Sequence, residues 1–303
     1  GITMKIIDKS VLRFHANNKP EAVVKPGEVL IFRAEDCFGN AVQEEISMAE
    51  IDLEYSNPAA GPVFVEGAGK GDVLKVEILK IDLNDHGVVC TFGHCGPFQD
   101  KNEIRTRILA VSPDGKTRFK GIEWFVDPMV GVIGTSPAEG EIGCGYAFNL
   151  GGNMDCSVIT AGSTVYLPVE VEGALLQMGD IHASMGDGEL TGTGMEIQGD
   201  IMVRVSVIKE FELNWPVVET KDAWYVCTAD QRMEPAFRKA AAEIRRLVAD
   251  AYGWDDTDVA LYMTLRGKME ANQACMDDDF QTVRMGIPKT PSKAPLIPGD
   301  REG

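Results

Sequence analysis

Short apolar runs that alternate with polar residues are the feature that most constrains this fold. Four such runs, at 28–32, 73–78, 165–171 and 201–207, each follow a glycine or a Pro-Gly pair. Successive side chains of a strand point to opposite faces, so a spacing of two places the apolar residues on one buried face. Repeated half-buried strands predict antiparallel sheets packed as a β-sandwich or jelly roll.

The pattern changes near residue 230. Apolar residues over 237–251 recur three and four positions apart, which places them on one helical face. Pro235 suits the first turn of this helix and Gly253 suits its C-terminal cap. A second helix is predicted over about 257–265, with Asp256 or Thr257 as its N-cap. The segment from residue 288 onward is predicted to be extended or irregular.

The expected fold class is therefore mainly β. We expect a β-sandwich with jelly-roll-like character plus a C-terminal α-containing (α+β) segment. The expected division is a body at 1–225 that carries the site and a helix-containing segment at 226–303 packed on it. No linker separates the two parts, so a single domain is an equally consistent interpretation of this boundary.

Composition excludes several classes of function. The formal net charge of -18 and the sequence pI near 4.6 argue against a nucleic-acid partner, because phosphate binding needs a basic stripe. No run of about 18 apolar residues occurs, so no membrane span is expected. We expect a cytoplasmic protein, because no secretion signal precedes the body and the seven cysteines form no CxxC pair.

The segment GDIHASMGDGE at 179–189 concentrates polar groups that can carry chemistry. Asp180 and His182 are two residues apart and can share one face of a strand. Asp187 and Glu189 repeat that spacing after a glycine. Carboxylates this close repel one another, take up protons or share a cation. The alternative is a glycine-rich acidic loop that faces water.

Three more acids follow turns or strands elsewhere in the chain. Asp155 ends the motif GGNMD, Asp36 follows an apolar strand, and Glu196 lies just downstream of 179–189. One imidazole with several carboxylates suits zinc, manganese or iron, and an all-oxygen site suits calcium. No HExxH signature is present, so the residues alone leave open whether these acids bind metal or only cap their own turns.

A nucleophilic cysteine is a second interpretation. Cys95 directly follows His94, and Cys156 directly follows Asp155. Neighbouring residues of a strand point to opposite faces, and a free cysteine is more often a small buried hydrophobe. The chain lacks GxGxxG followed by a distant acid, GxxxxGK[ST] and GxSxG, which removes the usual markers of dinucleotide binding, P-loop phosphoryl transfer and serine hydrolysis.

Taken together, these blocks resemble the acetamidase/formamidase family of amide hydrolases. The resemblance extends over nearly the whole chain and is most specific in GGNMD and GDIHASMGDGE. The matching blocks are VKPGEVLIFRAED at 24–36, GPVFVEGAGKGDVLKVEI at 61–78, GGNMD at 151–155, YLPVEVEGALLQMGDIHASMGDGE at 166–189 and TGMEI at 193–197.

The resemblance implies a β-sandwich that assembles as a homodimer or higher homo-oligomer. It implies hydrolysis of a short aliphatic amide, such as formamide or acetamide, to the acid and ammonia. It also implies a divalent metal. By residue type zinc is the leading candidate, and calcium would suit an additional all-oxygen site. The matching positions make Asp36, Asp155, His182 and Glu196 the expected ligands, with Asp187 and Glu189 near the reacting water.

The resulting hypothesis is hydrolysis by a metal-activated water, with His182, Asp187 and Glu189 as catalytic residues and Glu189 as the proton carrier. Two alternatives stay open. One is a thiol-dependent amidase that uses Cys95 or Cys156. The other is a non-catalytic β-sandwich that binds a metal or small ligand.

Overall fold

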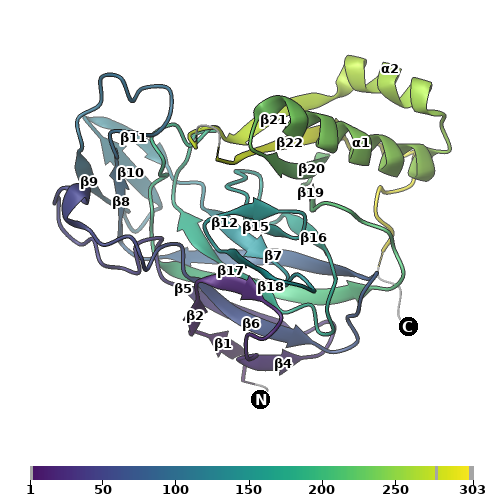
Figure 1. Ribbon diagram of the computed structural model, residues 1–303, viewed down its shortest axis with the longest axis horizontal. Helices are drawn as coiled ribbons and strands as arrows, with labels where there is room; N and C mark the ends of the chain where they lie inside the picture. Colours follow the sequence, from purple (N-terminus) through teal and green to yellow (C-terminus); the bar gives the residue numbers. More distant parts are fainter. Residues whose placement is uncertain (1–2, 277–278, 300–303) are drawn as a thin grey trace.

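Two large sheets packed face to face form the centre of the molecule (Figure 1). The computed structural model describes residues 3–276 and 279–299. The order of strands in the nine-stranded sheet is β1 (Lys5–Ile7), β5 (Val29–Ala34), β18 (Gly199–Ile208), β7 (Val73–Leu83), β16 (Thr164–Pro168), β19 (Val217–Glu219), β20 (Ala223–Asp230), β22 (Gln281–Pro288) and β21 (Lys268–Gln273).

The second large sheet lies against the first. Its order is β14 (Ala147–Phe148), β15 (Gly151–Asn153), β12 (Met129–Gly134), β17 (Leu176–His182), β6 (Ala59–Val65) and β2 (Ser10–Val11), with β4 (Ala22–Val24) also paired to β6. Shorter pairs join β10 (Lys116–Phe119) to β11 (Ile122–Phe125), β13 (Glu141–Gly143) to β3 (Arg13–His15), and β8 (His86–Cys90) to β9 (Thr106–Ala110), and η1 is a 3-10 turn (Met48–Glu50).

The main hydrophobic core lies between the two large sheets. Leu30, Val76 and Val203 enter it from one sheet, and Val130 and Met178 enter it from the other. The alternating runs found in the sequence form β5, β7, β16 and β18, all in the nine-stranded sheet. A mainly β sandwich with a C-terminal helical segment is therefore confirmed.

The two helices cover one end of the nine-stranded sheet. Helix α1 (Met233–Tyr252) packs on β20 and β22 through an amphipathic face, and α2 (Asp256–Arg266) lies beside it (Figure 1). Pro235 is in the first turn of α1, and Gly253 is its left-handed C-cap with φ 70°, as expected. The predicted N-cap of α2 is wrong by one residue. Asp255 is the cap, because its carboxylate accepts the N–H of Asp258 at 2.8 Å.

The expected boundary at residue 225 falls inside β20, and β20, β22 and β21 continue the nine-stranded sheet. The division into two parts stays a prediction. After β22 the described chain to residue 299 has no further strand or helix, which confirms the irregular tail over those residues. None of the helices in the described residues combines the length and the apolar character that a membrane span requires.

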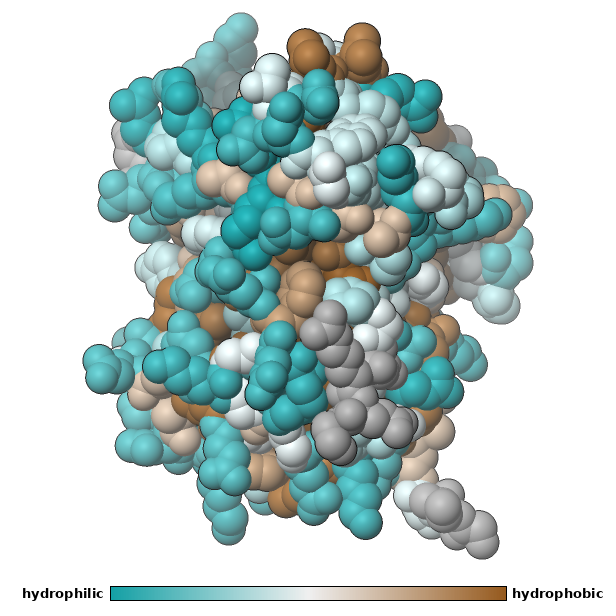
Figure 2. All heavy atoms as spheres, turned by 90° about the vertical axis from the view of Figure 1, so that its right-hand side faces the viewer, coloured by the Kyte–Doolittle hydropathy of each residue, from teal (hydrophilic) through white to brown (hydrophobic). Residues whose placement is uncertain are grey.

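The surface is largely polar on the side that Figure 2 shows. In the view turned by 90° from Figure 1, hydrophilic residues predominate and hydrophobic ones are interspersed among them (Figure 2). The fold thus keeps most of its apolar side chains between the sheets and under the helices. Polar side chains that are nevertheless buried at the edge of this core therefore call for an explanation.

Candidate functional site

A buried imidazole whose Nε2 atom faces four carboxylates lies at the end of β17. The Nε2 atom of His182 is 2.9 Å from Glu196 Oε2, 3.3 Å from Asp180 Oδ1, 3.5 Å from Glu189 Oε2 and 3.9 Å from Asp155 Oδ1. Each of these five residues has a relative exposure of 4% or less. Charged groups so far from water persist only when they are paired, protonated or bound to a cation.

The strands of the second sheet explain how these side chains meet. Asp180 and His182 lie on β17, which is buried along its whole length, and β12 pairs with it. His182 also forms an isolated antiparallel bridge with Glu196, which brings the downstream segment back against β17. The predicted contact between Asp180 and His182 is therefore present.

Two glycines leave the space that the site requires. A Cβ on Gly131 would lie 2.6 Å from Asp180 Oδ2 and 2.7 Å from Asp155 Oδ1. A Cβ on Gly194 would lie 2.8 Å from the imidazole of His182. Both approaches are closer than a real Cβ atom allows, so these glycines serve the packing of polar side chains.

Three of the four acids have left-handed backbones. The φ angle is 48° at Asp155, 53° at Asp180 and 46° at Glu189. Residues other than glycine adopt this region at a cost of about 1–3 kcal/mol each, and such residues concentrate at functional sites. Strain at three neighbouring carboxylates is thus a second, independent sign of a site.

Burial and mutual repulsion hold protons on this cluster in the absence of a cation. Burial raises the pKa of Glu189 to about 7, and burial together with the neighbouring carboxylates raises the pKa of Asp155 and of Glu196 well above the usual value. Burial alone would lower the pKa of His182, but the carboxylates of Glu196 and Asp180 outweigh it and raise that pKa well above its ordinary value.

Gln273 completes the cluster from β21. Its Nε2 atom donates to Asp155 Oδ2 at 2.6 Å and to Glu189 Oε1 at 2.7 Å. The side-chain amide therefore joins two carboxylates that come from distant parts of the chain. Two short hydrogen bonds from one amide hold both acids in fixed positions.

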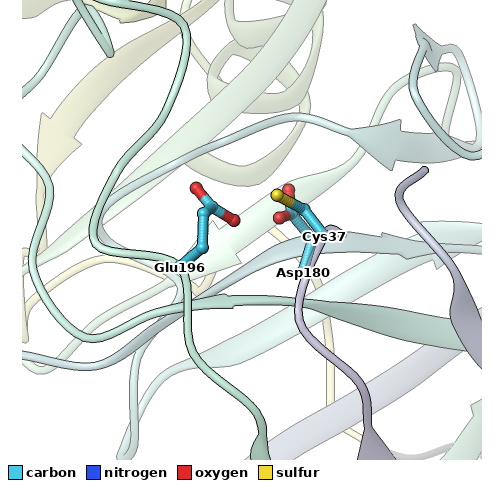
Figure 3. A group of neighbouring side chains, drawn as sticks. All are labelled: Cys37, Asp180 and Glu196. Carbon is cyan, nitrogen blue, oxygen red and sulfur yellow. The ribbon is translucent and has the colours of Figure 1, made fainter. Parts of the chain in front are cut away.

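The donor atoms fit a divalent cation. Asp155 Oδ1 and Glu196 Oε1 are buried and have no hydrogen-bond partner among the described residues. Ligand atoms of Asp155, His182 and Glu189 lie within 4.8 Å of one another, and so do those of the second group, Cys37, Asp180 and Glu196. The side chains of this second group extend toward a shared space (Figure 3). Imidazole, carboxylate and thiolate are the ligand types that zinc takes.

The site faces a cavity of about 210 Å³. Asp155, Asp180, Glu189, Glu196 and Gln273 supply its polar wall. Apolar and aromatic side chains from other segments supply the rest, among them Phe38, Leu53, Phe92, Met276 and Phe280. An apolar cavity with a few convergent polar groups is the usual form of a small-molecule site.

Four residues predicted from the sequence come together here: Asp155, His182, Glu189 and Glu196. Asp36 is also buried, but its carboxylate stabilises the turn in which it lies. Its Oδ1 accepts the N–H groups of Phe38 and Asn40 at 2.9 and 2.8 Å. It belongs to neither ligand group found among the described residues, and Cys37 takes part instead. Asp36 as a ligand stays a prediction.

Asp187 lies apart from the imidazole. Its carboxylate forms a two-pronged pair with Arg284, at 3.1 Å from Nη1 and 2.8 Å from Nη2, and accepts the hydroxyl of Ser157 at 2.6 Å. Although partial burial opposes ionisation, these hydrogen bonds lower the pKa of Asp187 below its ordinary value. The structure thus places Asp187 in an ion pair, and its role near the water stays a prediction.

The cysteines proposed as nucleophiles have different surroundings. Cys95 is buried and lines the cavity. Cys156 is fully buried, and its Sγ atom lies 3.8 Å from that of Cys227. Cys37, which the sequence did not single out, meets Asp180 and Glu196, and burial together with these acids raises the pKa of its thiol well above the usual value.

Sequence reasoning missed Cys37 and Gln273 as members of the site. Cys37 directly follows Asp36, which is the last residue of the matching segment at 24–36, so the cysteine lay just outside that segment. Gln273 lies in KMEANQ, where nothing in the spacing of residues indicates a buried amide. Asp180 was placed beside His182 but not named as a ligand.

Comparison with known proteins agrees with this architecture. A thermophile protein from Thermoanaerobacter tengcongensis, described as a predicted acetamidase/formamidase, superposes with a TM-score of 0.90 at 36% identity and covers 94% of this chain and 96% of its own. An acetamidase from Bacillus halodurans gives 0.89 at 31% identity, covering 93% and 97%. These two likenesses span nearly the complete length of each protein.

A formamidase from Methylophilus methylotrophus is 26% identical over 259 residues, which is 65% of this chain and 64% of that enzyme. The chain thus spans slightly less than two thirds of the length of the curated relatives it matches. The model of the Acetamidase/Formamidase family matches residues 5–140 and 147–251. Those matched ranges include Asp155, His182, Glu189 and Glu196, and with the fold and the strained acidic cluster they establish that the chain belongs to the acetamidase/formamidase family.

Proposed function

We propose that this protein is an amidohydrolase that converts short aliphatic amides, of the formamide or acetamide type, to the carboxylate and ammonia. The observation that carries the proposal is the buried imidazole of His182 with four carboxylates around it, set in a small cavity. Membership of the family supports the reaction type, and the named relatives support a linear amide as substrate.

A divalent cation fits the site, with Asp155 and His182 of one candidate group and Cys37, Asp180 and Glu196 of the other as the proposed ligands, which leaves Glu189 free to carry a proton. Zinc is the proposed metal for the group that contains the imidazole. Such a cation, when bound, acidifies water and polarises a carbonyl oxygen. The orphaned buried acceptors of Asp155 and Glu196 support this assignment.

Glu189 is the residue best placed to move the proton. Burial holds its pKa at about 7, close to the value at which a carboxyl group both accepts and returns a proton near neutral pH. We propose that it takes the proton of the attacking water and delivers it to the departing nitrogen. Gln273 holds one oxygen of Glu189, and the other faces His182 at 3.5 Å.

The size of the cavity suits a small substrate. Its volume of about 210 Å³ holds on the order of seven water molecules at their liquid volume, which suits a short acyl chain better than a peptide. The apolar side chains of Phe38, Phe92 and Phe280 would contact that acyl chain, and the polar wall would face the amide group.

Ammonia release from a panel of formamide, acetamide, propionamide and benzamide tests this function. The protein is analysed for metal and assayed as purified, after chelation, and after zinc is restored. We expect turnover of the small amides, loss on chelation and recovery with zinc. A well-folded protein that turns over none of them in any state would refute the proposal and favour a non-catalytic metal- or ligand-binding sandwich.

The position of Cys95 in the cavity wall supports the alternative of a thiol-dependent amidase. Cys95→Ala and Cys156→Ala separate the two mechanisms. Under the metal-dependent proposal each variant keeps ammonia release, and its response to chelation is unchanged. Abolition of turnover in one variant with normal metal content would support the thiol mechanism.

We also propose a cytoplasmic homodimer or higher homo-oligomer, an assembly that the family resemblance implies. Light scattering after size-exclusion chromatography measures the protomer number, and a monomer at micromolar concentration would contradict the assembly.

A further inference from the structure

Gln273 is held in place by three separate segments that meet at the site. Its backbone N–H donates to Thr282 Oγ1 at 3.0 Å, and that hydroxyl donates to the carbonyl of Met154, next to Asp155, at 2.7 Å. On its other side Gln273 forms an isolated parallel bridge with Gly188, next to Glu189. The register of β21 shifts just before Gln273, and such bulges redirect side chains near active sites.

The orientation of the Gln273 amide follows from its neighbours. Both contacts of Nε2 are with carboxylate oxygens, at 2.6 and 2.7 Å. A cation bound at the site would keep both acids ionised, and reversing the amide would then direct the lone pairs of Oε1 at two carboxylates, which is unfavourable. The NH₂ group therefore faces Asp155 and Glu189, and the carbonyl oxygen is directed elsewhere.

That carbonyl oxygen has no protein partner among the described residues, although Gln273 is only 3% exposed. Gln273 lines the same cavity as Asp155 and Glu189. A buried acceptor without a donor is costly in a folded protein, so each one requires an explanation. A ligand in the cavity that supplies an N–H group would satisfy it.

We propose that the side-chain oxygen of Gln273 accepts a hydrogen bond from the N–H of the substrate amide and thereby selects amides over esters. This inference rests on the proposed function of the site. An ester of the same acid has no N–H and would leave Oε1 unsatisfied. The product carboxylate also lacks a donor and would meet a lone pair there, which favours its release once ammonia has formed.

The Gln273 side chain thus has two roles. Its NH₂ group positions Asp155 and Glu189, and its oxygen recognises the nitrogen that leaves. A site built to accept a hydrogen bond discriminates strongly against an analogue that lacks the donor, because the buried acceptor then stays unpaired. A purely apolar cavity of this size would discriminate far less between acetamide and methyl acetate.

The test compares two substrates of similar shape in three proteins. Acetamide and methyl acetate are each measured as competitors of formamide hydrolysis, which is followed through the release of formate. Each compound thus gives a competition constant that reports its binding and does not depend on its own turnover. The proteins are the wild type, Gln273→Met, which removes the amide at similar length, and Gln273→Asn, which keeps an amide but cannot reach the same position.

We expect Gln273→Met to raise the competition constant of acetamide by about ten- to a hundredfold, while that of methyl acetate changes by less than about threefold. Gln273→Asn should follow the same pattern if Gln273→Met does not fold. Thr282→Val is the matched control, because it loosens the backbone of Gln273 and leaves the amide present. It should change both constants by a similar factor.

Metal content is measured in every variant to separate recognition from positioning. Equal losses for acetamide and methyl acetate in Gln273→Met and Gln273→Asn, with lowered bound zinc, would reduce Gln273 to a positioning residue and overturn the inference. An unchanged preference for acetamide would overturn it as well. If the wild type releases no ammonia from any short amide, the proposed function itself fails, and that result is distinct from either outcome.

Discussion

Replacing Glu189 by glutamine is expected to stabilise the metal-free protein at alkaline pH although it removes a catalytic group. Burial raises the pKa of Glu189 from 4.5 to about 7. The folded state therefore binds more protons than the unfolded state between these values, and stability falls as pH rises through that window. A shift of this size corresponds to about 3 kcal/mol, since one unit equals about 1.4 kcal/mol.

Glutamine is neutral at every pH and nearly isosteric, and its oxygen can still accept the Nε2–H of Gln273. At pH 8 the free energy of unfolding of Glu189→Gln should exceed that of the wild type by most of this difference, and at pH 5 by little. With an unfolding entropy of about 2.1 cal/mol/K per residue over 303 residues, the melting temperature would rise by about 5 °C at pH 8.

The assay is thermal unfolding of chelated wild type and Glu189→Gln at pH 5 and pH 8, followed by ammonia release after zinc is restored. Asp187→Asn is the control, because its carboxylate pairs with Arg284 and has a lowered pKa. It should show no alkaline stabilisation. A Glu189→Gln protein that is no more stable than wild type at pH 8 would refute the reasoning that the ionised carboxylate of Glu189 is destabilising where it is buried.

Three further predictions concern the same cluster. His182→Ala should lose bound metal and ammonia release together, and retention of both, by metal analysis and assay, would exclude His182 as a ligand. Gly131→Ala should weaken zinc binding at least tenfold in a competition titration, because its new Cβ would lie 2.6 and 2.7 Å from two site carboxylates, whereas Gly186→Ala, with nothing within 4 Å, should match wild type. Asp187→Asn should lower the free energy of unfolding, measured by chemical denaturation, by about 1–2 kcal/mol, because it weakens the pair with Arg284. It should lower kcat less than Glu189→Gln does. An equal loss of kcat would indicate that Asp187 acts on the reacting water.

The fold was predictable where one face of an element is buried and the other is not. β5, β7 and β18 alternate in burial along much of their length, and α1 repeats with the helical period. β12 and β17 are buried on both faces, so their apolar residues show no alternation, and only the spacing of Asp180 and His182 indicated the end of β17 as a strand. Their glycines even suggest loops, although Gly131 and Gly179 are strand residues packed against neighbouring atoms.

The site was predictable to the extent that its residues are close together in sequence or belong to specific motifs. The spacing of Asp180 and His182 predicted their contact, and the resemblance supplied Asp155 and Glu196. Gln273 could not be predicted, because its amide reaches the site only through the pairing of β21 at the far edge of the nine-stranded sheet. Long-range pairing of this kind leaves no local pattern.

The position of the acids on the sandwich explains how the fold tolerates them. Four carboxylates and one imidazole leave an excess of negative charge that water cannot solvate, and proton uptake or a cation must compensate it. β17 carries two of these groups and is held between β12 and β6, so the strained φ angle of Asp180 cannot relax without disrupting the sheet. The second sheet therefore fixes Asp180 and His182, and the buried segments outside the strands that carry Asp155, Glu189 and Glu196 pack against them. The same repulsion that destabilises the metal-free protein strengthens its attraction for a cation. Variants of these acids that stabilise the metal-free protein should therefore bind the cation more weakly.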